Sequence, residues 1–84
     1  MATNYGNDYE NGKFTVLMLR SGMQVVSPTP DGFKWGPHGY EAKVAFVLPL
    51  DGKPYGVEEM AVTEAAIEAR YVVTYKQMQE RFVH

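Results

Sequence analysis

The sequence predicts one α+β domain: a small antiparallel sheet of about four strands with one C-terminal helix packed on one face. Three observations support this fold class. Two stretches alternate their side chains at the two-residue period of strands, the C-terminal third repeats apolar residues at helical spacing, and Pro- and Gly-rich segments separate the elements. The chain has 84 residues, too few for two independent cores, so residues 13–84 are expected to form a single domain.

The first two strands are predicted on either side of a Ser-Gly pair. Residues 13–20, KFTVLMLR, place apolar side chains on both faces, which is typical of a central strand or of one covered on both sides. The Ser-Gly pair predicts a two-residue hairpin turn into a second strand over residues 23–27. Pro28 and Pro30 then end the pairing because proline has no backbone N–H to donate.

The next two strands are predicted around a turn that contains Gly and Pro. Residues 41–50, EAKVAFVLPL, form the third strand, and Pro49 places its end at a sheet edge or a bulge. A turn over residues 51–56 leads to a short fourth strand over residues 57–62. The sheet face away from the helix stays partly apolar, so it needs a partner or cover from other parts of the chain. This face comprises Leu17, Leu19, Val26 and Val47.

A single helix is predicted to follow Thr63, which is a good N-cap residue, and to run to Phe82. Its apolar stripe recurs at intervals of four, four, three and four residues. The stripe consists of Ile67, Tyr71, Tyr75, Met78 and Phe82. Residues 71–75, YVVTY, favour strands instead. A shorter helix followed by a strand over residues 71–75 is therefore the alternative.

A second, small-residue face of this helix predicts a contact between two copies of the chain. It consists of Ala65, Ala66, Ala69 and Val73. Small side chains allow close approach of another helix or sheet, so a homodimer could form across this face. The simpler alternative is an exposed helix face, because alanine is the best helix former.

The N-terminal segment and the hydropathy of the chain bear on its location. Residues 1–12 are rich in Asn and Gly without periodicity, which predicts a flexible leader. They contain no apolar segment of the kind found in secretory signals. No stretch approaches the roughly 20 consecutive apolar residues of a membrane span. We therefore expect a cytoplasmic protein with no membrane association.

Composition argues against several kinds of chemistry. The chain has no cysteine, which excludes disulfides, thiolate metal sites and a cysteine nucleophile. His38 with Asp31 and Glu41 is too few ligands for a convincing metal site, and no spacing suggests a catalytic triad or a phosphate loop. We therefore expect no enzyme activity, cofactor or metal. Eight basic residues stand against ten acidic ones, so nucleic acid is not a favoured partner.

The most unusual stretch is residues 29–40, TPDGFKWGPHGY, which predicts a structured loop or an irregular hairpin tip. Aromatic side chains bury much area at a small cost in entropy and are enriched in interface hot spots. The stretch therefore provides the candidate partner-binding residues, with core packing as the equal alternative for the single Trp. These residues are Phe33, Lys34, Trp35, His38 and Tyr40.

These observations predict a non-enzymatic protein-binding module, a small regulator or inhibitor of a larger protein. Viruses and plasmids encode many small accessory proteins of this kind. The suggestion that this chain is one of them rests on how common such proteins are and on no particular residue. The alternative is a small-ligand or single-stranded nucleic-acid binder that stacks its ligand on the same aromatic side chains.

Overall fold

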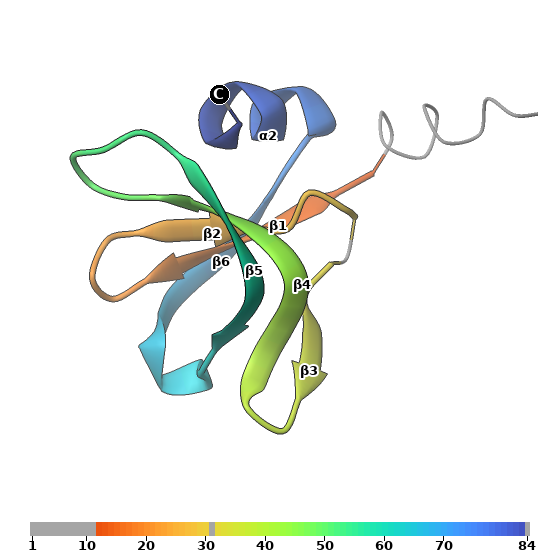
Figure 1. Cartoon of the computed structure of the whole chain (residues 1–84), viewed down its shortest axis with the longest axis vertical. Coiled ribbons are helices and arrows are strands. Elements are labelled where there is room, and N and C mark those ends of the chain that lie inside the picture. The colour runs from red at the N-terminus through yellow and green to blue at the C-terminus, as the bar shows by residue number, and fades with distance from the viewer. Residues whose placement is uncertain (1–11, 31, 84) are drawn as a thin grey trace, which may run out of the picture.

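The computed structural model describes residues 12–30 and 32–83, so the predicted leader over residues 1–12 lies almost wholly outside the described part. The fold class is α+β, as predicted, with one antiparallel sheet of six strands and a single C-terminal helix (Figure 1). The elements are β1 (Phe14–Leu19), β2 (Gln24–Val26), β3 (Lys34–Gly36), β4 (Gly39–Leu48), β5 (Tyr55–Val62), the 3-10 helix η1 (Glu64–Ala66), β6 (Ile67–Val73) and the α-helix α2 (Tyr75–Phe82).

The sheet pairs the first strand of the described chain, β1, with the last, β6. Its strand order is β3-β4-β2-β1-β6, and β5 pairs with the other edge of β4. β6 pairs antiparallel with β1, from Phe14 opposite Val73 to Leu19 opposite Ile67. The four predicted strands all form within a few residues of their expected bounds, and β3 and β6 are the two additions.

One face of the sheet packs under α2. Phe14, Val16 and Val26 meet the helix residues Met78 and Phe82 in one buried cluster. The helix begins at a capping box: the Gln77 backbone N–H donates to Thr74 Oγ1 at 3.2 Å, and the Thr74 N–H donates to Gln77 Oε1 at 3.0 Å. This reciprocal pair satisfies two of the backbone donors that a helix start otherwise leaves unpaired.

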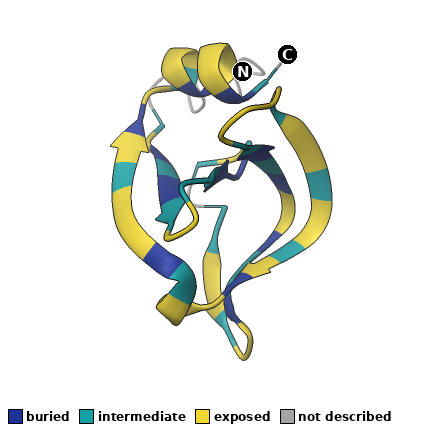
Figure 2. Ribbon diagram, turned by 90° about the vertical axis from the view of Figure 1, so that its left-hand side faces the viewer, coloured by how far each residue is buried: buried dark blue, intermediate teal, exposed yellow. Residues whose placement is uncertain are grey.

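The other face forms a second buried cluster inside the curl of the sheet (Figure 2). Leu17 and Val47 belong to it, as predicted, with Leu19 packed against it. Val26 was assigned to this face wrongly, because it lies under α2, and Val25 takes its place. The cover comes from the chain itself, since aromatic residues 33 and 40 pack against this cluster.

The curl arises at one position where β4 and β5 bend together. Tyr40 packs against the inner cluster at one end of β4, and Val47 belongs to it at the other, although their positions in the strand differ by seven, an odd number. A regular strand alternates its faces, so the inward-facing set must change between them. At that point Glu59 on β5 has a φ of 55°, a left-handed conformation that costs a residue other than glycine about 1–3 kcal/mol.

The C-terminal segment differs from the predicted helix. Residues 67–73 form β6 because they pair with β1, with one irregularity between Ala69 and Ile67. Of the expected helix, residues 64–66 form the 3-10 helix η1, and only the last eight residues, Tyr75–Phe82, are α-helical. Thr63 is extended and makes no side-chain cap hydrogen bond, so Thr74 is the helix N-cap. The alternative, a shorter helix followed by a strand over residues 71–75, is closer to the structure: the 3-10 helix η1 precedes β6, and β6 includes residues 71–73, although Tyr75 already belongs to α2.

The small-residue helix face expected for a homodimer is therefore not formed. Ala65 and Ala66 lie in η1, Ala69 is exposed on β6, and Val73 is buried beneath α2. The spacing of these four residues places them on one face of a helix, but not on one face of the 3-10 helix and strand that form instead. No helix in the described part of the chain is long and apolar enough to cross a membrane.

We expect Phe82→Ala to lower the free energy of unfolding by about 3–5 kcal/mol, because it empties a fully buried aromatic site between α2 and the sheet. Urea denaturation followed by circular dichroism measures this change. Gln79→Ala on the exposed side of α2 is the control and should change the value by less than about 0.5 kcal/mol. Equal effects of the two substitutions would contradict the packing of α2 on the sheet.

Candidate functional site

The β3–β4 hairpin presents the aromatic stretch at one end of the molecule (Figure 1). Trp35 lies opposite Tyr40, and Gly36 lies opposite Gly39 across the turn at Pro37 and His38. Gly39 has a φ of 107°, and a Cβ at this position would lie 2.3 Å from the Val62 carbonyl oxygen. Only glycine tolerates this combination of a left-handed φ and close approach, so Gly39 fixes how the hairpin meets the end of β5.

Trp35 is held on the surface by the residue opposite it. Its side chain is 66% exposed, so it serves as a surface group rather than a core group. The ring packs edge-on against Tyr40, with 5.0 Å between centroids and 70° between planes. This is a favoured aromatic geometry, and Tyr40 in turn packs against the inner cluster. Trp35 is therefore exposed on a paired strand, and Tyr40 supports its ring from the side of the inner cluster.

Two residues from the other end of the chain complete this surface. The Arg70 guanidinium lies 5.1 Å from the Tyr40 ring centroid and donates to the Tyr40 hydroxyl at 3.2 Å. It also donates to both carboxylate oxygens of Glu64, at 2.7 Å for Oε2. The hydrogen bond that Arg70 donates to the Glu64 carboxylate raises the pKa of Arg70, so the guanidinium stays charged. We call Trp35, Tyr40, Arg70 and Glu64 the tryptophan surface.

The five predicted partner-binding residues do not share one environment. Lys34, Trp35 and His38 are exposed, whereas Phe33 and Tyr40 are half-buried and pack against the inner cluster. His38 lies in the hairpin turn, where its backbone N–H donates to Glu41 Oε2 at 3.1 Å. In the described ranges, no three His, Asp or Glu side chains gather in an arrangement that could hold a metal ion.

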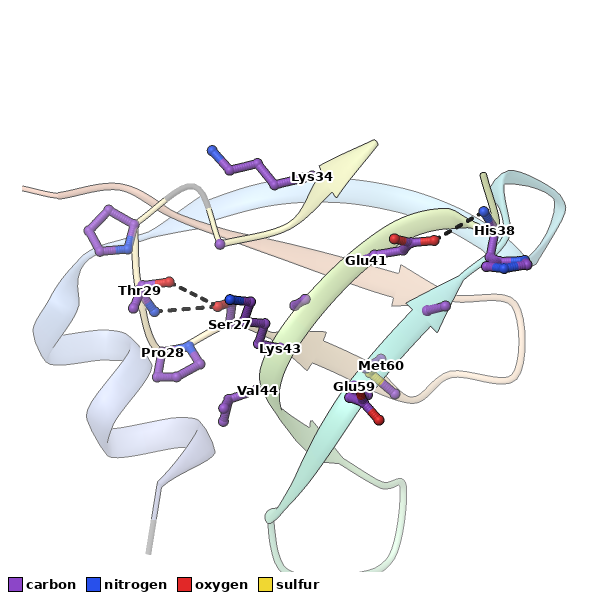
Figure 3. Close-up of a pocket in the computed structure, with 14 residues that line it drawn as sticks. Ser27, Pro28, Thr29, Lys34, His38, Glu41, Lys43, Val44, Glu59 and Met60 are labelled. Atoms are coloured by element: carbon purple, nitrogen blue, oxygen red, sulfur yellow. Dashed lines mark hydrogen bonds between the residues drawn. The ribbon is translucent and has the colours of Figure 1, made fainter. Parts of the chain in front are cut away.

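A groove lies beside the tryptophan surface, on the side of His38 (Figure 3). It has a volume of about 810 Å³ and is open to solvent. Its walls are the loop after β2, the first half of β4 and part of β5. Pro28, Pro30 and Met60 contribute apolar wall, and Lys34 and Lys43 contribute positive charge.

Sequence reasoning missed Arg70 and Glu64 as part of this surface. Both fall within the segment that the sequence predicts as a helix, away from the aromatic stretch. Neither lies near the aromatic stretch in sequence, since 30 residues separate Arg70 from Tyr40. They meet because β6 and η1 pass close to the start of β4, and no local spacing signals that approach.

Comparison with family models, with curated proteins and with solved structures found no match to this chain. The function is therefore argued from the geometry alone.

We expect Gly39→Ala to destabilise the domain by about 1–3 kcal/mol, through the left-handed φ and the clash with the Val62 carbonyl. Gly36→Ala in the same hairpin is the matched control. Its Cβ would meet only the Glu41 carboxylate, at 2.5 Å, and that flexible side chain can move aside. Thermal melts of both variants test this difference, and a smaller loss for Gly39→Ala than for Gly36→Ala would contradict it.

Proposed function

We propose that this chain is a non-enzymatic protein-binding module that contacts a larger protein through the tryptophan surface. The observation that supports the proposal is the exposure of Trp35 on the paired β3–β4 hairpin, where its ring packs against Tyr40. Trp, Tyr and Arg are the residue types most enriched in interface hot spots, and all three adjoin here. A partner that covers this surface would act on or be regulated by the module.

The energetics of Trp35 favour a contact role. The exposed two-thirds of a tryptophan side chain amount to about 150 Å², whose burial contributes roughly 3–4 kcal/mol before other costs. Immobilising a side chain on binding costs free energy, and that cost is smaller where packing already restricts the ring. The edge-on contact with Tyr40 provides such a restriction.

The alternative ligand for the same surface is a single-stranded nucleic acid or a small aromatic ligand stacked on Trp35. Its weakness is electrostatic. The formal net charge is −2, and Glu64 already pairs with the adjacent Arg70. Phosphate contacts require free cations and weaken steeply with salt, so salt dependence separates the two classes.

We expect Trp35→Ala to weaken partner binding by about 30-fold or more, as for an interface hot spot, while the domain stays folded. The partner is first captured from host lysate, purified and titrated against each variant by calorimetry. Tyr55→Ala is the matched control, because Tyr55 is also an exposed aromatic residue, 50% exposed on β5 away from the tryptophan surface.

Four results would count against the proposal. Loss of binding with both variants, or with neither, would remove Trp35 as the anchor. Unfolding of Trp35→Ala would give the residue a structural role instead. Binding only to nucleic acid, with an affinity that falls steeply as salt is added, would favour the alternative.

A further inference from the structure

The two outermost strands of the sheet, β5 and β6, each have one free edge. In the described part of the chain, β5 pairs only with β4, and β6 pairs only with β1. Figure 2 shows β6 along one outer side of the molecule, between η1 below and α2 above. An unpaired edge is a template for another strand, and proteins usually protect such edges with charges, prolines or bulges.

The hydrogen bonds of β1 show which of its residues face β6. The Leu19 N–H donates to the Met23 carbonyl oxygen at 2.8 Å, on the side of β2. Successive residues of an antiparallel strand direct their N–H and C=O groups to opposite neighbours. Val16 lies three positions from Leu19, so its backbone groups face β6 instead.

The same alternation identifies the outward-facing groups of β6. Val16 lies opposite Tyr71, which therefore forms its hydrogen bonds with β1. The residues on either side of Tyr71, which are Arg70 and Val72, direct their N–H and C=O groups to the free edge. Within the described ranges, no strand or backbone hydrogen bond engages these groups.

The free edge of β6 lacks the usual protection. Residues 69–73, ARYVV, pair regularly with β1 and include no Gly, Pro or Lys. Their one charge is that of Arg70, whose guanidinium pairs with Glu64 and lies over the Tyr40 ring. Val72 is apolar and 57% exposed. This stretch is therefore regular, apolar and without a free charge of its own.

The free edge of β5 is protected in two ways. Its pairing with β4 omits Glu59, where the φ of 55° disturbs the strand. Glu58 and Glu59 are both exposed, so a second copy of the chain on this edge would bring like charges together. Of the two free edges, only that of β6 is suited to pairing with an identical strand.

We infer that two copies of this chain pair through the free edges of β6 to form one continuous antiparallel sheet. A two-fold axis makes two identical strands antiparallel, so an edge strand can pair with its own copy. With the axis beside Tyr71, Arg70 of each copy lies opposite Val72 of the other. Each of these two pairs exchanges two backbone hydrogen bonds.

The side chains of this edge are complementary to those of a second copy. Arg70 and Val72 project from the same face of β6, so the apolar stem of Arg70 covers Val72 of the second copy. On the other face the two Tyr71 side chains become cross-strand neighbours, a favourable aromatic pair. The Arg70 charge is already paired with Glu64, so the edge selects neither an acidic nor a basic strand.

Sedimentation velocity of the full chain tests the dimer. A five-residue edge contact is smaller than the roughly 1,200 Å² of stable interfaces, so the dimer is weak and concentrated samples are needed. Between about 10 µM and about 1 mM, we expect the mass to rise from 9.5 kDa toward twice that value. Val72→Lys should raise the dissociation constant by about tenfold or more, because it places a charge on the edge.

Two variants serve as controls. Val44→Lys also replaces an exposed valine, 43% exposed on β4, and should change the dissociation constant by less than about twofold. Trp35→Ala should leave it equally unchanged, because the β6 edge does not use Trp35. The inference is thus independent of the proposed function, and a failure of either is seen with a different variant.

Amide hydrogen exchange followed by NMR tests the pairing residue by residue. The Arg70 and Val72 N–H groups face the free edge, so their exchange should slow as the protein concentration rises. The Tyr71 N–H, bonded to β1, should be protected at every concentration.

The inference is overturned if the chain stays monomeric at about 1 mM, or if Val72→Lys dimerises as the wild type does. It is also overturned if the Arg70 and Val72 amides are already protected in the dilute monomer, since another part of the chain would then cover the edge. Should Val72→Lys unfold, the exchange of these two amides in the wild type decides.

Discussion

The structure depends on one constraint: within the described residues, a single sheet with two apolar faces has one short α-helix to cover it. α2 has eight residues and covers the Phe14 side. The other face is buried because β4 and β5 bend together beside Glu59, which lets both ends of β4 pack into one inner cluster. The strained φ of Glu59 is tolerated because the buried apolar area on both sides of the bend outweighs its cost.

Both candidate surfaces follow from this curl of β4. Where β4 starts, its hairpin with β3 holds Trp35 outward while Tyr40 fills the inner cluster. Farther along the same edge, strand pairing is interrupted between β3 and β2, and the groove opens there. Both candidate surfaces thus lie where β4 departs from a regular, fully paired strand, above the two buried clusters.

The helix prediction failed for a reason that the residues themselves explain. A spacing of four residues fits one face of a helix and also one face of a strand, because four is a multiple of two. In β6 an irregularity in the pairing with β1 then separates Ile67, in the inner cluster, from Tyr71, which packs on the α2 side. The segment has strong strand formers around Val72, and pairing with β1 decides in their favour. After Thr74 the spacing includes a three-residue step, from Tyr75 to Met78, which only a helix accommodates, and α2 forms there.

By itself the sequence determined the α+β class, four of the six strands and the set of aromatic residues in the β3–β4 hairpin, because alternation, proline and turn chemistry act locally. Tertiary structure alone decided that Trp35 is exposed, that Arg70 joins Tyr40, and that residues 42–45 lack a strand partner on one edge. Each depends on strands paired across long sequence separations, and a local pattern carries no information about which distant edge a strand will meet.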